Sequence, residues 1–209
     1  MRKLTLLLLT LLPCLALSAQ EADIRRLAEH YADVQTLSAT VVRTRHNAVL
    51  TRDEVTRGHF FLKKPGKMCL SFEDNKDMLL MDAGVFTLVQ DGRQSVAKGR
   101  NGRVLGTLGT VLRGLFSDGE EDYAPDEAAT VAVEQKDGHC ILTVTPVLKS
   151  DKEKRRLMFT SFVLTLDNAT GRLQSLRMNE RGENYTQYDL SGHQPGANLS
   201  DSVFIPAAR

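Results

Sequence analysis

The stretch Gly58–Phe72, GHFFLKKPGKMCLSF, holds two runs in which apolar and polar residues alternate, with a Pro-Gly pair between them. In the first run Phe60 and Leu62 share one face, and in the second every other residue from Met68 to Phe72 is apolar. Successive side chains of a strand point to opposite faces, so the stretch predicts two antiparallel strands with one continuous apolar wall.

Similar alternation recurs along most of the chain, with turn pairs such as Asp-Gly between the runs. The predicted strands cover residues 38–45, 58–64, 68–72, 77–81, 85–90, 130–135, 140–145, 158–166, 173–179 and 185–190. Helical spacing occurs over 23–34 and again over 105–116, and the second of these follows a basic, glycine-containing stretch at 99–103 that we expect to be a flexible loop. This order predicts one antiparallel sheet curled towards a barrel, in a single domain.

A strongly curved sheet that is covered by short helices leaves room for an apolar ligand at its mouth. The wall of that cavity is predicted from the apolar side chains of successive strands, which are Phe60, Leu62, Met68, Leu70, Phe72, Met78, Leu80, Phe86 and Leu88. The helix over 105–116 is the predicted lid, and its residues Val111, Leu112, Leu115 and Phe116 are expected to face the sheet. An ordinary packed core is the competing interpretation of the same residues.

The first residues have the three-part layout of a secretory signal peptide, with a basic start, an apolar run and small residues before the cleavage site. A membrane-spanning helix would need about 20 apolar residues, and the run is shorter than that. We therefore expect residues 1–19 to be cleaved and residues 20–209 to form one periplasmic domain. Cys69 and Cys140 would then be the cysteines of an exported protein, and because strand alternation points one to a polar face and the other to an apolar face, we expect them to remain unpaired.

Composition and motifs exclude several classes of function. With 42% hydrophobic residues, 25% charged residues and a formal net charge of +1, the chain lacks the basic excess of a nucleic-acid binder. Nucleophile-elbow, zinc-protease and phosphate-loop motifs are absent from the sequence, and the five histidines have no metal-ligand spacing. We expect no catalytic residue, no metal and no cofactor.

Taken together, the order of these elements resembles the periplasmic lipoprotein carriers of the LolA family. The resemblance rests on Gly58–Pro65, on the apolar strands that follow it, and on the C-terminal stretches Phe162–Asp167, Asn179–Thr186 and Leu199–Pro206. It implies an incomplete antiparallel β-barrel of about 11 strands that is covered by short α-helices. In that family, the arginine before the proline hydrogen-bonds the lid and holds the empty cavity closed.

Lys64 stands at that latch position here, and it keeps the positive charge without the planar guanidinium fork. The resemblance implies a monomeric, non-enzymatic carrier that takes acylated lipoproteins from an inner-membrane ABC transporter and passes them to an outer-membrane receptor. Two alternatives remain open, because a fold does not determine a function. One is an envelope-sensing or regulatory lipid-binding module, and the other is a carrier of another lipid or glycolipid.

Overall fold

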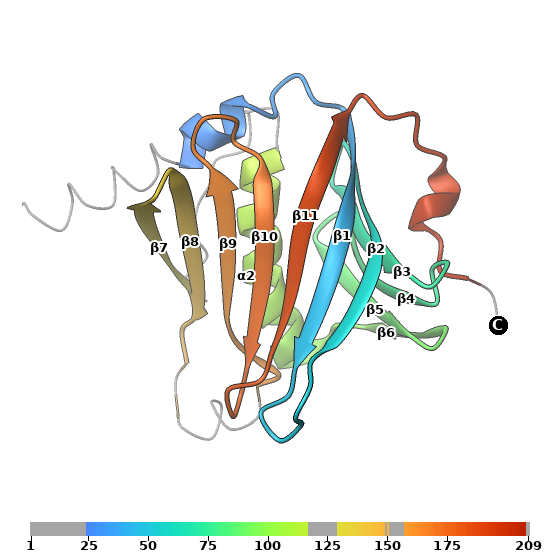
Figure 1. Cartoon of the computed structure of the whole chain (residues 1–209), viewed down its shortest axis with the longest axis vertical. Coiled ribbons are helices and arrows are strands. Elements are labelled where there is room, and N and C mark those ends of the chain that lie inside the picture. Colours follow the sequence, from blue (N-terminus) through green and yellow to red (C-terminus); the bar gives the residue numbers. More distant parts are fainter. Residues whose placement is uncertain (1–23, 117–128, 149, 151–156, 208–209) are drawn as a thin grey trace, which may run out of the picture.

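The computed structural model describes residues 24–116, 129–148, 150 and 157–207, so the predicted signal peptide lies outside the described residues. Its strands form one antiparallel sheet in the order β6-β5-β4-β3-β2-β1-β11-β10-β9-β8-β7 (Figure 1). The strands are β1 (Thr36–His46), β2 (Glu54–Lys63), β3 (Lys67–Phe72), β4 (Asp77–Asp82), β5 (Val85–Gln90), β6 (Arg93–Val96), β7 (Ala129–Lys136), β8 (His139–Pro146), β9 (Phe159–Asp167), β10 (Leu173–Glu180) and β11 (Tyr185–Pro195).

The first and last strands of the chain lie side by side at the middle of the sheet. Val41 of β1 is opposite Leu190 of β11 on one side and Gly58 of β2 on the other. Two arms extend from this centre, one ending at β6 and the other at β7, and these two edge strands do not pair with each other. The barrel is therefore open, as predicted.

Helix α2 (Gly99–Phe116) lies within the curve of the sheet, and a short helix over residues 24–29 lies at one end of it (Figure 1). The predicted fold class, an unclosed antiparallel barrel with helical cover, is confirmed. Helix α2 begins at Gly99, so the stretch at 99–103 is helical and the prediction of a loop there is wrong. The first helix ends at residue 29 and is followed by a turn, which makes it shorter than predicted.

The main core lies between the concave face of the sheet and the helices. Helix α2 contributes Val104, Leu105, Leu108, Val111, Leu112, Leu115 and Phe116, all of them buried. The sheet contributes the predicted apolar wall at Phe60, Leu62, Met68, Leu70 and Phe72, together with buried residues from β8 to β11. Burial of these side chains is the main force that holds helix and sheet together.

A second, smaller core lies on the convex face, where the C-terminal 3-10 helix η1 (Asp201–Phe204) packs. It consists of Cys69, Met78, Val89 and Phe204, with Phe61, Leu80, Leu199 and Val203 packed against it. Met78 and Leu80 were predicted to line the cavity, and that prediction is wrong. Because Leu70 pairs with Leu79 and Met68 pairs with Met81 across β3 and β4, it is Leu79 and Met81 that share the concave face.

Cys69 and Cys140 form no disulfide with each other, as predicted, and both are buried. Cys140 lies in the main core, and Cys69 lies in the convex core, where its thiol donates a hydrogen bond to the Val203 carbonyl at 3.4 Å. Burial raises the pKa of Cys69 to about 12, so this thiol stays protonated and unreactive near neutral pH. The face of β3 that looked polar in the sequence is thus covered by the C-terminal segment.

Candidate functional site

Helix α2 occupies the concave side of the sheet, where the sequence predicted a cavity. The predicted lid residues Val111, Leu112, Leu115 and Phe116 are buried in the same cluster as the predicted wall residues Phe60, Leu62, Met68, Leu70, Phe72 and Phe86. Leu88 is partly buried and packs against this cluster. The structure therefore brings the predicted lid and wall together, apart from Met78 and Leu80, in a packed arrangement.

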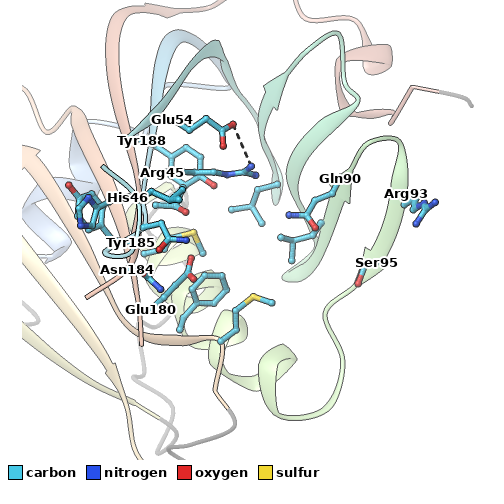
Figure 2. A pocket seen from close by; sticks show the side chains of 18 residues that line it. Arg45, His46, Glu54, Gln90, Arg93, Ser95, Glu180, Asn184, Tyr185 and Tyr188 are labelled. Atoms are coloured by element: carbon cyan, nitrogen blue, oxygen red, sulfur yellow. Dashed lines mark ion pairs between the residues drawn. The ribbon is translucent and has the colours of Figure 1, made fainter. Parts of the chain in front are cut away.

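An open pocket of about 450 Å³ lies at one end of the half-barrel, between the two arms of the sheet. Leu79 and Leu88 line it from one arm, and Phe159, Met178 and Tyr188 line it from the other. Figure 2 shows polar residues across the same space, with Gln90 and Ser95 on one side and Glu180 and Tyr185 on the other. Pockets that hold small ligands usually measure roughly 300–1,000 Å³ and combine an apolar lining with a few polar groups. This pocket has both features.

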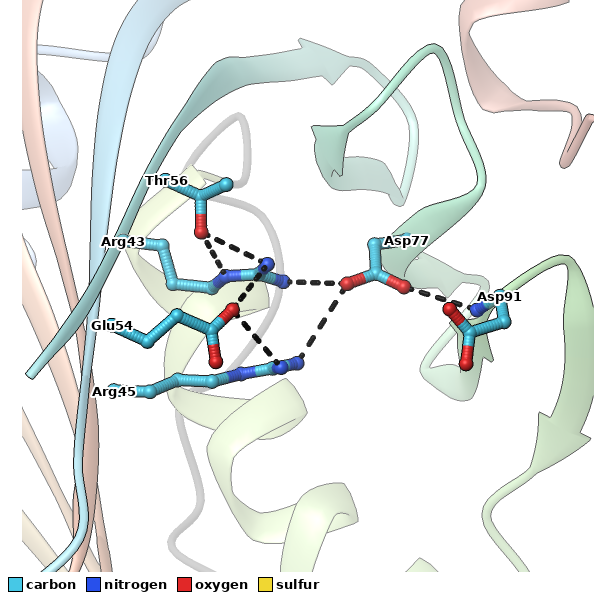
Figure 3. A network of polar contacts seen from close by, with 6 residues as sticks. All are labelled: Arg43, Arg45, Glu54, Thr56, Asp77 and Asp91. Carbon is cyan, nitrogen blue, oxygen red and sulfur yellow. Dashed lines mark hydrogen bonds and ion pairs between the residues drawn. The ribbon is translucent and has the colours of Figure 1, made fainter. Parts of the chain in front are cut away.

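Charged side chains gather on the concave face at this end (Figure 3). Arg43 of β1 donates to Asp77 Oδ2 of β4 at 3.1 Å and to the Thr56 hydroxyl of β2 at 3.0 and 3.2 Å. Arg45, two residues further along β1, lies 3.8 Å from the same Asp77 oxygen and 3.7 Å from Glu54 Oε1. Two arginines thus share carboxylates from two different strands.

Arg43 is almost completely buried, and its surroundings explain how a guanidinium is accommodated there. The guanidinium carbon lies 4.2 Å from the centroid of the Phe72 ring, in a cation–π contact. The ring in turn lies across Gly58, where a β-carbon would collide with it and with the Ser71 carbonyl. Gly58 is therefore required for the close approach of Phe72 to β2, and that approach provides the surface on which Arg43 stacks.

This charged group was not predicted from the sequence. Arg43 and Arg45 follow Leu37, Ala39 and Val41 at alternate positions of β1, so they share the inward face with buried apolar residues. Two arginines at the inward positions of a strand were the available signal. Asp77, their main partner, could not be assigned from the sequence, because the face of β4 was itself ambiguous.

Tyrosines at this end of the barrel are held in place by neighbours. The Tyr185 ring stacks on His46 at 4.8 Å between centroids, and the Arg177 guanidinium lies 3.6 Å from the Tyr185 centroid. Tyr188 is buried beside Phe72 at 6.1 Å, and burial raises the pKa of Tyr188 to about 12. Tyr185 and Tyr188 thus form an aromatic wall of the pocket on its β11 side.

At the other end of the concave face, Lys64, the residue at the predicted latch position, contacts the turn after the short helix. Its ammonium donates to the Tyr31 carbonyl at 2.6 Å and to the Ala32 carbonyl at 3.2 Å, in the turn after the short helix. The Tyr31 ring packs edge-on against Phe116 of α2, with centroids 4.7 Å apart, and its hydroxyl accepts a hydrogen bond from the Leu173 backbone at 3.0 Å. Lys64 is thereby connected, through Tyr31, to the end of α2.

Replacing Lys64 with methionine is expected to loosen residues 24–33 and the end of α2. The variant loses two hydrogen bonds from a charged donor, each worth roughly 1.5–3 kcal/mol at most in a part-buried setting. Hydrogen exchange of these segments should become about tenfold faster or more. Lys63→Met is the matched control, since the neighbouring Lys63 points to the convex face and pairs with Asp201 at 2.7 Å. Equal exchange in the two variants would contradict a latch role for Lys64.

The fold and the site define a class of architecture: an open half-barrel wrapped around one helix, with a charged pocket at its mouth. No family model matches the chain, and no curated protein matches it. Within the described residues, no helix is long and apolar enough to cross a membrane, and no group of three or more metal-ligating side chains is found.

Solved structures with a similar course of the chain include a DUF1329 family protein from Desulfovibrio piger, at 13% identity and a TM-score of 0.47, covering 91% of this chain and 97% of that one. Another is an outer membrane lipoprotein-sorting protein domain from Vibrio parahaemolyticus. It has 14% identity and a TM-score of 0.44, and the match covers 87% of this chain and 95% of that one. A LolA superfamily protein from Nitrosomonas europaea has 10% identity and a TM-score of 0.37, and the match covers 86% of this chain and 96% of that one.

Proposed function

We propose that this protein is a non-enzymatic, monomeric periplasmic carrier that holds acyl chains between α2 and the concave face of the sheet. The observation that carries the proposal is that the apolar wall is covered mainly by one amphipathic helix, while a pocket partly lined by the same core residues opens at one end of the half-barrel. Acyl chains have the same apolar character as the leucines of α2, and they can replace them against the wall. Each buried methylene contributes roughly 0.8 kcal/mol, so a few acyl chains suffice for tight binding.

Helix α2 has features that suit a movable cover. The hydroxyl of Thr107 donates to Val104 O and that of Thr110 donates to Gly106 O, so both hydrogen bonds stay within the helix. At Gly106, a β-carbon would meet nothing within 4 Å, so no packing contact requires glycine there. A glycine inside a helix costs about 1 kcal/mol relative to alanine. Gly106 therefore weakens the helix without improving its packing, which favours a helix that moves.

The proposed cargo is the lipid part of acylated lipoproteins, taken from an inner-membrane ABC transporter and delivered to an outer-membrane receptor. An acyl-chain site that makes no contact with the protein part would accept lipoproteins of many sequences. The signal peptide predicted at residues 1–19 supports export of the carrier to the compartment between the two membranes. Lys64 serves in this proposal as the latch that keeps the empty carrier closed.

Depletion of the protein in its source bacterium, followed by separation of inner and outer membranes, tests the proposal. We expect lipoproteins to accumulate in the inner membrane, and mass spectrometry of the purified carrier to find lipoprotein or lipid. Complementation with the Lys63→Met variant, which leaves the concave face intact, is the positive control. Normal lipoprotein sorting together with bound lipid would favour a carrier of another lipid or a lipid-binding sensor. Absence of any bound lipid would contradict the whole proposal.

A further inference from the structure

Two side chains of opposite charge face the pocket at the mouth of the half-barrel without pairing with each other. Arg45 reaches into it from β1, and Glu180 reaches into it from β10 (Figure 2). The Arg45 nitrogens lie 3.7 and 3.8 Å from the carboxylates of Glu54 and Asp77, which is longer than a hydrogen bond of 2.7–3.2 Å. Among the described residues, Glu180 forms no ion pair. Both groups therefore have hydrogen-bonding capacity to offer a ligand.

Glu180 is partly buried, so a positively charged partner would stabilise its ionised carboxylate. Burial raises the pKa of Glu180, while the charge of Arg45 and a hydrogen bond from Thr186 lower it in part. A cation beside Glu180 would offset the cost of removing its charge from water. Arg45 offers the complementary function, because its planar fork of N–H donors matches the oxygens of a phosphate or carboxylate.

The polar groups lie directly above an apolar floor. Leu79, Phe159, Met178 and Tyr188 line the pocket and also belong to the main core that contains the buried face of α2. A ligand with its polar end between Arg45 and Glu180 would thus extend its apolar end along this floor towards α2. If α2 moves aside as proposed, the pocket and the acyl-chain site would form one continuous surface that is polar at the mouth and apolar within.

We propose that the mouth pocket is a headgroup site for acyl lipids that carry both a phosphate and an ammonium group. The phosphate is bound by Arg45 and the ammonium by Glu180. This inference rests on the proposed function, because the acyl chains of such a lipid would occupy the site under α2. A purely anionic headgroup fits less well, since the Glu54 and Glu180 carboxylates line the same pocket and would repel a second negative charge, and Asp77 lies 3.8 Å from Arg45.

Titration calorimetry with the full mature protein tests the proposal, using lipids below their critical micelle concentrations. The probes are dioctanoyl phosphatidylethanolamine, dioctanoyl phosphatidylglycerol and the acyl-free glycerophosphoethanolamine. We expect phosphatidylethanolamine to bind about tenfold or more tightly than phosphatidylglycerol, in line with one added charge-assisted hydrogen bond. The acyl-free headgroup should bind far more weakly than either lipid, which distinguishes a lipid site from a site for a free phosphate ester.

Two variants separate the two halves of the site. Glu180→Gln should weaken binding of phosphatidylethanolamine to the level of phosphatidylglycerol, and Arg45→Gln should weaken both lipids by about tenfold. Glu183→Gln is the matched control, because Glu183 is exposed in the turn after β10 and does not line the pocket. Thermal unfolding shows whether each variant is folded.

The outcomes distinguish this inference from the proposed function. If both lipids bind equally, or if Glu180→Gln leaves the preference unchanged, the headgroup site is wrong and acyl-chain carriage still stands. If the acyl-free headgroup binds as tightly as the lipids, the pocket is a site for small phosphate esters, and the lipid assignment is wrong. If no lipid binds the wild-type protein, the proposed function fails and this inference fails with it.

Discussion

Asp77→Asn is expected to lower the free energy of unfolding by about 3–5 kcal/mol, because it removes the carboxylate partner of a buried guanidinium. The Arg43 side chain is 4% exposed and that of Asp77 is 13% exposed, so water cannot replace the lost charge. Urea unfolding followed by circular dichroism measures the change. The m-value should stay the same, since the surface exposed on unfolding is unchanged.

Two companion variants establish the cause of this loss. Glu54→Gln should cost less than about 1 kcal/mol, since Glu54 is 59% exposed and lies 3.7–3.9 Å from the arginines. The double variant Arg43→Met/Asp77→Leu should recover most of the stability, because removing both charges leaves none unpaired in the interior. If Asp77→Asn proves as mild as Glu54→Gln, Arg43 does not depend on Asp77 and our account of this charged group is wrong.

Leu112→Ala is expected to change stability and ligand affinity in opposite directions. Leu112 is fully buried between α2 and the sheet, so its truncation should lower the free energy of unfolding by about 2–5 kcal/mol. The same change makes α2 easier to displace, which raises the fraction of molecules able to accept an acyl chain and with it the apparent affinity. Titration with a synthetic diacyl lipopeptide, with hydrogen exchange of α2 in parallel, measures both effects.

Two further variants serve as controls for α2. Gly106→Ala strengthens the helix by about 1 kcal/mol without steric conflict, so it should lower the apparent lipopeptide affinity. Met78→Ala removes a buried side chain from the convex core, away from α2, and should lower stability without raising affinity. If Leu112→Ala and Met78→Ala affect lipopeptide binding equally, α2 is a fixed part of the core and not a lid.

Much of the fold could be predicted from local sequence patterns, because the period of a strand or helix determines which of its side chains share a face. Alternation in Gly58–Phe72 placed Phe60, Leu62 and Met68 on one face, and the structure has them in the main core. Spacing of three and four predicted the buried face of α2. Local patterns failed in the strand Asp77–Asp82, because its sequence DMLLMD has apolar residues on both faces. Only the pairing with β3 determined that Leu79 and Met81 point inward.

The sequence by itself determined most strand and helix faces, the lack of a disulfide between Cys69 and Cys140, and the position of Lys64 at the end of an apolar strand. Only the tertiary structure decided where the charges of the interior meet. Arg43 of β1 reaches Asp77 of β4 across the two strands between them, β2 and β3. The mouth pocket is lined by Arg45 from the centre of the sheet, Leu79 from one arm and Glu180 from the other. The physical reason is that side-chain direction is a local property of a strand, whereas contacts between residues of different strands depend on the order, twist and curvature of the whole sheet.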